Sequence, residues 1–264
     1  LVNPISADLS VMRPSILPNL LAAAARNQDR GETDVAMFEI GPVFLGDMPD
    51  EQRTACSGIR HGATAPREWH GILRKTDVFD AKADAEAALA ALGIRAAGIQ
   101  TSTEAPDYFH PGRSGALVQG RTKLASFGEL HPRIAESFGL RGTIVGFEIH
   151  VDDVPMPKSK GSAKSLLSMS VFQPVSRDFA FIVDESVVVG DLLRAVKSGA
   201  GSLLADMRVF DVYQGDNIEA GKKSIAITIT LSPTKATLTD DEIEKISASV
   251  IELAGKNCGA ILRG

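Results

Sequence analysis

The spacing of apolar residues between positions 177 and 263 allows few folds for the second part of the chain. Residues 177–184 and 224–232 alternate apolar with polar or small side chains, which is typical of strands, and residues 207–213 are also strand-like. Apolar side chains at helical spacing follow positions 189 and 243, and residues 259–263 read as a last short strand. The order βαββαβ predicts a ferredoxin-like domain, with four antiparallel strands and two helices on one face.

Local signals mark the ends of these two helices. Gly199 and Gly201 are expected to close the first helix, because glycine is common just after a helix. Thr239 with Glu242 three residues later forms a capping-box pattern, which predicts where the second helix begins.

The first part of the chain is also mixed. A helix is predicted to open after Ser15, another is stopped by Gly93, and a third follows His131 and Pro132. Strands are predicted at residues 35–44, 54–60, 114–118, 123–127 and 143–151. By itself, this pattern indicates an α+β domain with a largely antiparallel sheet.

A polar stretch separates the two parts. Residues 151–170 hold two prolines, three lysines and several serines without an apolar period, which is typical of a linker. We therefore predict a first domain at 1–155, a linker at 156–170 and a second domain at 171–264.

Charge and composition exclude several functions. Residues 1–155 carry 15 basic and 20 acidic side chains, whereas residues 156–264 carry 13 of each. Neither part has the basic surplus of a protein that binds mainly phosphate, so any nucleic-acid contact must be local or shared with another chain. No apolar run is long enough to span a bilayer, and Cys56 and Cys258 have no metal or disulfide spacing, so a cytoplasmic protein without a membrane partner is expected.

The sequence holds no recognisable catalytic motif. His110 and His131 each precede a proline at an element boundary, where a structural role in the turn is favoured over catalysis. Metal-ligand spacings, phosphate-binding glycine loops and a serine-nucleophile elbow are all missing from the sequence. We expect no catalytic residue, no metal ligand and no cofactor bound by this chain, and keep a hydrolase using His131 or His110 as an alternative.

A βαββαβ domain permits two binding uses, which fold alone does not separate. One is recognition of single-stranded RNA on the open sheet face; the other is binding of an amino acid at a dimer interface, as in ACT-like regulatory domains. Phe179, Phe181 and Phe210 fit a core better than a base-stacking surface. A better candidate surface is the polar set near the strand ends, which comprises Arg177, Arg208, Tyr213, Lys222, Lys223 and Ser224.

Long ordered stretches resemble one family. The segments FQPVSRDFAFIVDESVVVGDLL, RVFDVYQGDNIEAGKKSIAITITLSPTKATLTDDEI and GAILRG resemble the ferredoxin-fold anticodon-binding domain that ends the beta subunit of bacterial phenylalanine-tRNA ligases. The segments NPISADLSVMRPSILPNLL, VAMFEIGPVF, FDAKADAEAAL, HPGRSGAL and FGELHP, with Asn27 and Arg30, resemble that subunit's catalytic-like domain. The absence of an initial methionine agrees with a C-terminal part of a longer subunit.

The resemblance implies that the first domain is a class II synthetase-like scaffold and the second an RNA-binding module, both within a tetramer of two alpha and two beta subunits. The alpha subunit would attach phenylalanine to tRNA(Phe) with ATP and magnesium, and no DNA partner is implied. Residues 38–44 match a strand that carries an ATP-binding arginine in active relatives, yet they hold none, so an inactive domain is expected. Ser15 to Asn27 and the adjacent sheet would pack on the alpha subunit, unless this helix only fills its own core.

The resemblance also implies that the second domain reads the anticodon. The residues expected to bind tRNA are Arg177, Tyr213, Lys222, Lys223 and Ser224, with Tyr213 stacking on a base and the cations on phosphates or base edges. Arg177 has an alternative role, an ion pair with Asp178 or Asp211.

Overall fold

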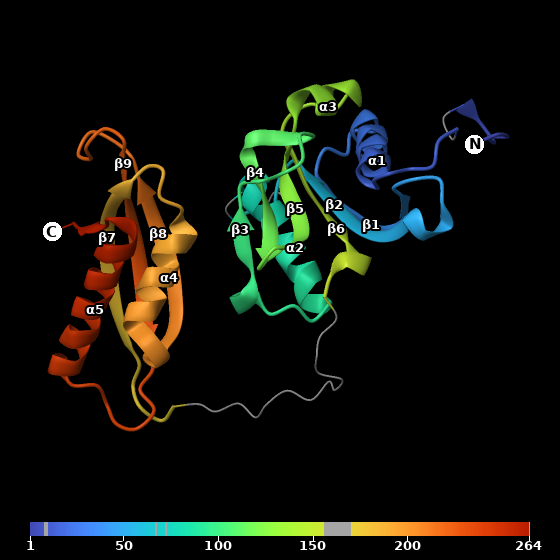
Figure 1. The fold of residues 1–264 in the computed structure, drawn as a ribbon. Coiled ribbons are helices and arrows are strands. Elements are labelled where there is room, and N and C mark those ends of the chain that lie inside the picture. Colours follow the sequence, from blue (N-terminus) through green and yellow to red (C-terminus); the bar gives the residue numbers. More distant parts are fainter. Residues whose placement is uncertain (8–9, 67, 72, 156–169, 264) are drawn as a thin grey trace. The chain divides into compact units, whose positions relative to one another are not determined.

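The structure, a computed structural model, describes residues 1–7, 10–66, 68–71, 73–155 and 170–263. The chain divides into two compact units, Leu1–Gly161 (unit 1) and Ser162–Gly264 (unit 2), whose elements are labelled in Figure 1. Most of the expected linker, residues 156–169, lies outside the described residues, so its exact bounds stay a prediction. Within the described ranges, no helix is both long and apolar enough to cross a membrane.

Unit 1 is built on a six-stranded sheet in which every neighbouring pair of strands is antiparallel. The strand order is β1-β2-β6-β5-β4-β3. Its helices and strands are α1 (Leu17–Asp29), β1 (Val35–Phe44), β2 (Gln52–His61), α2 (Val78–Ala91), β3 (Gln100–Ser102), β4 (Phe109–Gln119), β5 (Thr122–Leu130), α3 (Pro132–Ser137) and β6 (Ile144–His150).

Helices cover both faces of this sheet. Leu17, Leu20 and Leu21 of α1 are buried in a core with Ile59 on one face. On the other face, α2 packs over β2, β6 and β5 and buries Leu89. Strands between two helical layers place alternate side chains in the two cores, as expected for a pleated sheet.

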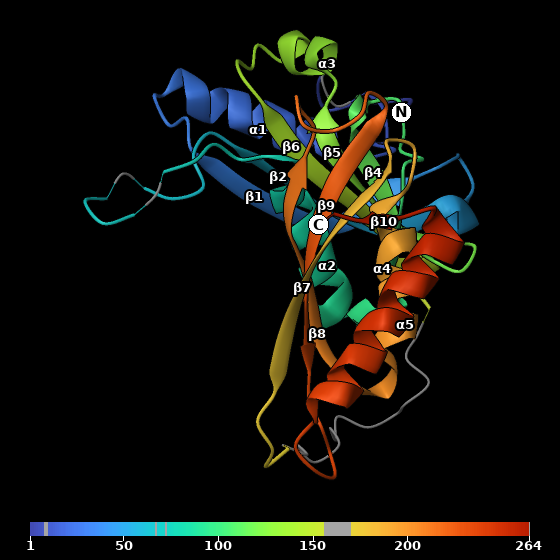
Figure 2. The same ribbon diagram turned by 90° about the vertical axis from the view of Figure 1, so that its left-hand side faces the viewer.

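Unit 2 has the βαββαβ order that the sequence predicts, and its sheet order is β10-β7-β9-β8. Figure 2 shows α4 and α5 lying side by side against this sheet. The core between these two helices and the sheet holds Phe179, Phe181 and the alternating isoleucines of β9. Its elements are β7 (Val175–Asp184), α4 (Val189–Ala200), β8 (Leu204–Tyr213), β9 (Lys222–Leu231), α5 (Asp240–Cys258) and β10 (Ile261–Leu262).

The helix ends confirm one prediction and correct another. The backbone N–H of Thr239 donates to the Glu242 carboxylate at 2.9 Å, which completes the predicted capping box of α5. Gly199 does not close α4: it lies inside the helix, and Gly201, with φ of 63°, follows the helix end. A Cβ at Gly199 would stand 2.6 Å from the Val250 Cα of α5, so this glycine permits close helix packing instead.

Candidate nucleic-acid interface

The sheet of unit 2 has one face that neither α4 nor α5 covers. The buried isoleucines at 225, 227 and 229 point to the helices, so the residues between them on β9 point to the open face. Strand pairing then brings residues of β7 and β8 beside them in three rows: Ile182–Ser224–Tyr213, Ala180–Ala226–Asp211 and Asp178–Thr228–Arg208.

The rows differ in the size and polarity of their side chains. Two alanines occupy the middle row, so the backbone there is covered only by methyl groups, while larger side chains stand in the rows on either side. In the third row the Thr228 hydroxyl donates to the Asp178 carboxylate at 2.6 Å. Adjacent strands lie roughly 4.8 Å apart, so Tyr213, Ser224 and Asp211 are immediate neighbours on this face.

An irregularity in β8 determines which side chains reach the open face. Val209 pairs with Ile227, but the next paired residue is Asp211 with Ala226, so Phe210 is the extra residue of a bulge. Strict alternation from Val209 would turn Tyr213 toward the helices. The bulge turns Asp211 and Tyr213 to the open face. Phe210 is 59% exposed, so the prediction that it lies in the core is wrong.

Tyr213, Asp211 and Ser224 form one corner of the open face, and the chemistry of this corner suits a nucleobase. The Tyr213 ring is 37% exposed and offers a flat apolar face. The Asp211 carboxylate is exposed on the same face and accepts hydrogen bonds, as the N–H groups of a base edge require. Sequence reasoning missed Asp211 as a site residue, because the bulge that aligns it with Tyr213 has no signal in the alternation pattern.

The structure does not bring the five predicted residues onto one surface. Tyr213 and Ser224 are paired neighbours, and Lys222 lies at the same end of β9. Lys223 faces the helix side, where its ammonium donates to the Glu185 carbonyl oxygen at 2.8 Å. Ser224 is 4% exposed, so its hydroxyl is reached only when neighbouring side chains move.

Arg177 lies at the other end of the sheet. Arg177 pairs with Ile229, whereas Val183, six positions further along β7, pairs with Lys223. At about 3.3 Å per residue, Arg177 and Val183 lie roughly 20 Å apart along the strand. Its guanidinium donates to the Ser176 carbonyl oxygen at 3.0 Å. Among the described residues no ion pair joins it to Asp178 or Asp211, so the alternative role, an internal ion pair, is not seen.

Lys222 is held at the edge of the site by an ion pair. Its ammonium lies 2.6 Å from the Glu219 carboxylate, and this contact raises the pKa of Lys222 and lowers that of Glu219. The lysine therefore stays charged, and solvent screening leaves the pair weak enough for a phosphate to compete with Glu219.

Unit 1 places both candidate histidines in turns. His110 Nδ1 accepts from the Gly112 N–H at 3.1 Å, and His131 Nδ1 accepts from the Arg133 N–H at 3.3 Å at the start of α3. These bonds fit the structural role that the sequence favours over a hydrolase. In the described ranges, no group of three or more His, Cys, Asp or Glu side chains is arranged to hold a metal.

A buried polar cluster lies on the α1 face of unit 1. The Glu148 carboxylate is 6% exposed and accepts from the hydroxyls of Ser15 at 2.6 Å, Ser57 at 3.2 Å and Tyr108 at 3.0 Å. Burial, followed by the charge and hydrogen bond of Glu148, raises the pKa of Tyr108. These hydroxyls satisfy the buried carboxylate, and in the part of the chain that the structure describes no ion pair reaches it.

The helix expected to pack on another subunit serves its own core. The apolar face of α1 is buried against β1 and β2, so only its polar face remains available. The Arg13 guanidinium lies against β1, where it donates to the Pro42 carbonyl oxygen at 3.0 Å and lies 2.6 Å from the Glu39 carboxylate.

Two families of known proteins match the chain in order. Residues 1–151 match the family described as "Phenylalanyl tRNA synthetase beta chain CLM domain", and residues 170–263 match the "Ferredoxin-fold anticodon binding domain". These matches favour the anticodon-binding interpretation of unit 2 over the amino-acid regulator.

Full-length relatives agree with both matches. The "Phenylalanine--tRNA ligase beta subunit" of Rhodospirillum rubrum is 48% identical over 264 residues, which cover 100% of this chain and 33% of that protein. The protein of the same name from Cereibacter sphaeroides is 49% identical over 266 residues, covering 99% of this chain and 33% of the relative. This chain therefore spans about a third of the length of the curated relatives it matches. Since the first family alone covers more than half of its residues, the chain belongs to the phenylalanyl-tRNA synthetase beta chain family.

Proposed function

We propose that this chain forms part of the beta subunit of a phenylalanine-tRNA ligase, in which unit 2 binds the anticodon of tRNA(Phe). Unit 1 is a scaffold without catalytic residues that packs on the alpha subunit. The alpha subunit carries out the ligation with ATP and magnesium in a cytoplasmic tetramer of two alpha and two beta chains.

The corner formed by Tyr213, Asp211 and Ser224 carries this proposal. A base that leaves its stack can lie over the low row of alanines with its ring against Tyr213 and its polar edge toward Asp211. Lys222 lies near enough to this end of the sheet to meet a backbone phosphate. The balanced charge of unit 2 supports weak binding by itself, strengthened by other contacts in the tetramer.

Titration of the 264-residue chain with a fluorescent tRNA(Phe) anticodon stem-loop tests the RNA site. Tyr213→Ala is expected to weaken binding by about 1–3 kcal/mol, the typical contribution of one stacked base. Lys222→Ala is expected to weaken binding to the same extent for every RNA sequence. It should also reduce the slope of log affinity against log salt concentration by about 1, which corresponds to one phosphate contact.

Lys235→Ala is the matched control for Lys222, because Lys235 is a lysine of unit 2 that is exposed but lies outside the sheet. Equal affinity of the Tyr213→Ala and wild-type chains would contradict the proposed site. A stem-loop with a changed anticodon that binds as well as the cognate one would contradict anticodon reading.

The scaffold role of unit 1 is tested by the exchange of pyrophosphate into ATP in the presence of phenylalanine. We expect no exchange by the 264-residue chain, since β1 carries no arginine for the ATP phosphate and the alpha subunit is proposed to carry out the ligation. Exchange that persists without the alpha subunit would refute this role.

A further inference from the structure

A polar pocket of about 240 Å³, here called the Glu148 pocket, lies on the α1 face of the unit 1 sheet. Strand pairing places Ser57 of β2 and Ser126 of β5 on either side of Glu148 of β6, and His150 lies two positions further along the same face. Helix α1 packs on β1 and β2, whereas the segment before β4, which carries Tyr108, borders the pocket. The pocket is therefore built from segments that are far apart in the sequence.

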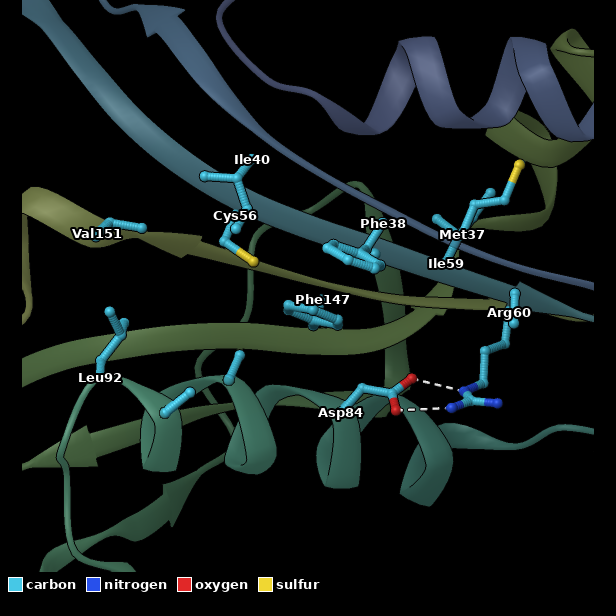
Figure 3. A pocket seen from close by; sticks show the side chains of 14 residues that line it. Met37, Phe38, Ile40, Cys56, Ile59, Arg60, Asp84, Leu92, Phe147 and Val151 are labelled. Carbon is cyan, nitrogen blue, oxygen red and sulfur yellow. Dashed lines mark hydrogen bonds and ion pairs between the residues drawn. The ribbon is translucent and has the colours of Figure 1, made fainter.

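This pocket differs from the larger hollow on the α2 face of the same sheet. Figure 3 shows that hollow, of about 520 Å³, between β1 and α2. Its lining is mainly apolar, and its charged groups, Arg60 and Asp84, are joined by hydrogen bonds of 2.6 and 2.8 Å. The charged groups of the hollow thus satisfy each other, whereas the Glu148 pocket keeps hydrogen-bonding capacity for a ligand.

Two side chains of the Glu148 pocket keep unused hydrogen-bond acceptors. The Glu148 carboxylate is 6% exposed and has about four acceptor positions, and three hydroxyl groups occupy three of them. His150 Nδ1 is buried, and among the described residues it has no hydrogen-bond partner. A buried polar atom without a partner is costly, so both side chains favour a ligand that donates hydrogen bonds.

The Ser126 hydroxyl oxygen supplies a third acceptor. Ser126 is 4% exposed and pairs directly with Glu148, so the two Cβ atoms lie roughly 5 Å apart. In the tautomer that carries its hydrogen on Nε2, His150 accepts at Nδ1, so acceptors of three residues line one cavity. A primary ammonium group is the matching donor, because it has three N–H bonds and no acceptor.

The charge of the pocket selects among ligands that carry an ammonium group. Glu148 and Asp153 contribute two carboxylates and Lys123 contributes one ammonium, which gives a formal charge of −1. In the described part of unit 1, no ion pair joins Lys123 to either carboxylate. A ligand with a single positive charge neutralises the pocket and supplies an opposite charge to the buried carboxylate. A zwitterionic amino acid would leave the formal charge unchanged.

We propose that the Glu148 pocket binds a small aliphatic amine through its primary ammonium group. The ammonium donates to the Glu148 carboxylate, the Ser126 hydroxyl oxygen and His150 Nδ1. The site belongs to unit 1 and does not depend on RNA binding by unit 2, so either proposal can fail without the other.

Titration of the 264-residue chain with ethanolamine tests the proposal, with the amide NMR shifts of residues 123–126 and 148–153 as the readout. We expect saturable shifts with a Kd of about 1 mM, which is within reach of so small a ligand. Ethylene glycol replaces the ammonium by a hydroxyl, and glycine replaces the hydroxyl by a carboxylate. Both are expected to bind at least about tenfold more weakly than ethanolamine.

Three results of this comparison would overturn the proposal. They are the absence of saturable shifts with ethanolamine, equal binding of ethylene glycol, and binding of glycine that is as tight as that of ethanolamine. The comparison uses the unaltered chain, so it remains decisive even if a variant does not fold.

Ser126→Ala is expected to weaken ethanolamine binding by about tenfold or more, because one hydrogen bond to a charged group is lost. Ser57→Ala is the matched control and should leave the Kd unchanged, since Ser57 also donates to Glu148 but is not among the residues that line the pocket. Equal losses in the two variants would show a disturbed Glu148 cluster instead of a lost contact, and would refute the assignment.

Lys123→Met tests the exposed end of the pocket. Lys123 is exposed, and its removal is expected to strengthen ethanolamine binding, because a like charge disappears. Binding that occurs only in this variant would mean that the Lys123 ammonium itself occupies the site, which would contradict the proposal.

Discussion

Glu148 is a buried carboxyl group whose hydrogen bonds come from hydroxyl groups of distant segments. Its two carboxylate oxygens receive three hydroxyl donors, from the segment before α1, from β2 and from the segment before β4. Hydrogen bonds to an ionised group are stronger than neutral ones, and each contributes about 1.5–3 kcal/mol. The cluster therefore ties three distant parts of unit 1 to β6.

Tyr108→Phe tests the cluster through its pH dependence. At pH 7 the loss of one hydroxyl donor is expected to lower the free energy of unfolding of unit 1 by about 1.5–3 kcal/mol. Because burial and Glu148 raise the pKa of Tyr108 in the folded state, the unfolded chain releases the tyrosine proton first, and the stabilisation is lost as pH rises above 10.0, the usual tyrosine pKa. Urea unfolding followed by circular dichroism from pH 7 to 11 should show the difference between wild type and variant shrinking.

Tyr213→Phe is the control, since it removes a tyrosine hydroxyl from unit 2 instead. A wild-type advantage over Tyr108→Phe that stays constant to pH 11 would contradict the role given to the Tyr108 proton.

At the scale of elements, the contact between α4 and α5 depends on a missing side chain. Alanine normally stabilises an exposed helix position by about 1 kcal/mol relative to glycine. At Gly199 an added Cβ would stand 2.6 Å from the Val250 Cα and 2.8 Å from its nitrogen, so the helices would have to separate.

Gly199→Ala is therefore expected to destabilise unit 2 by about 1–3 kcal/mol, the usual cost of overpacking. Gly190→Ala in the same helix is the matched variant: nothing lies within 4 Å of its added Cβ, so it should leave unit 2 as stable or more stable. Thermal unfolding of the two variants measures the contrast, and equal melting temperatures would refute the close-packing role of Gly199.

The sequence predicts elements well where the signal is local. The period of β1 and the Thr239–Glu242 box locate a strand and a helix start correctly, because both depend on neighbours within a few residues. It does not predict β3, whose three residues are too few for a period and are fixed by pairing with β4. Likewise, the need for a glycine at position 199 comes from its close approach to Val250 of α5, which is far away in the sequence, so no local pattern predicts it.

The candidate site is predictable in part. Tyr213 and Ser224 are expected from the sequence and meet across β8 and β9. Arg177 and Lys223 are expected beside them but point elsewhere, since the face of each side chain depends on strand register and on the distance along the sheet. Asp211 joins the site only through the bulge.

At the scale of the whole molecule, each unit has a hydrophobic core of its own. We therefore expect residues 170–264, expressed alone, to fold and to melt at the temperature of the corresponding transition in the full chain. Differential scanning calorimetry makes the comparison, and failure of the separate segment to melt cooperatively would show that unit 2 depends on the rest of the chain.

The β8 bulge lets this strand change in length by one residue without changing the face that its site residues occupy. Phe210 is the extra residue, so its removal would leave Asp211 and Tyr213 paired with β9 as before, both on the open face. Removing Val212 instead would turn Tyr213 toward α4 and α5, because side chains alternate between the two faces of a strand. Alignments of relatives across β8 are therefore best judged by whether they keep one residue between Asp211 and Tyr213.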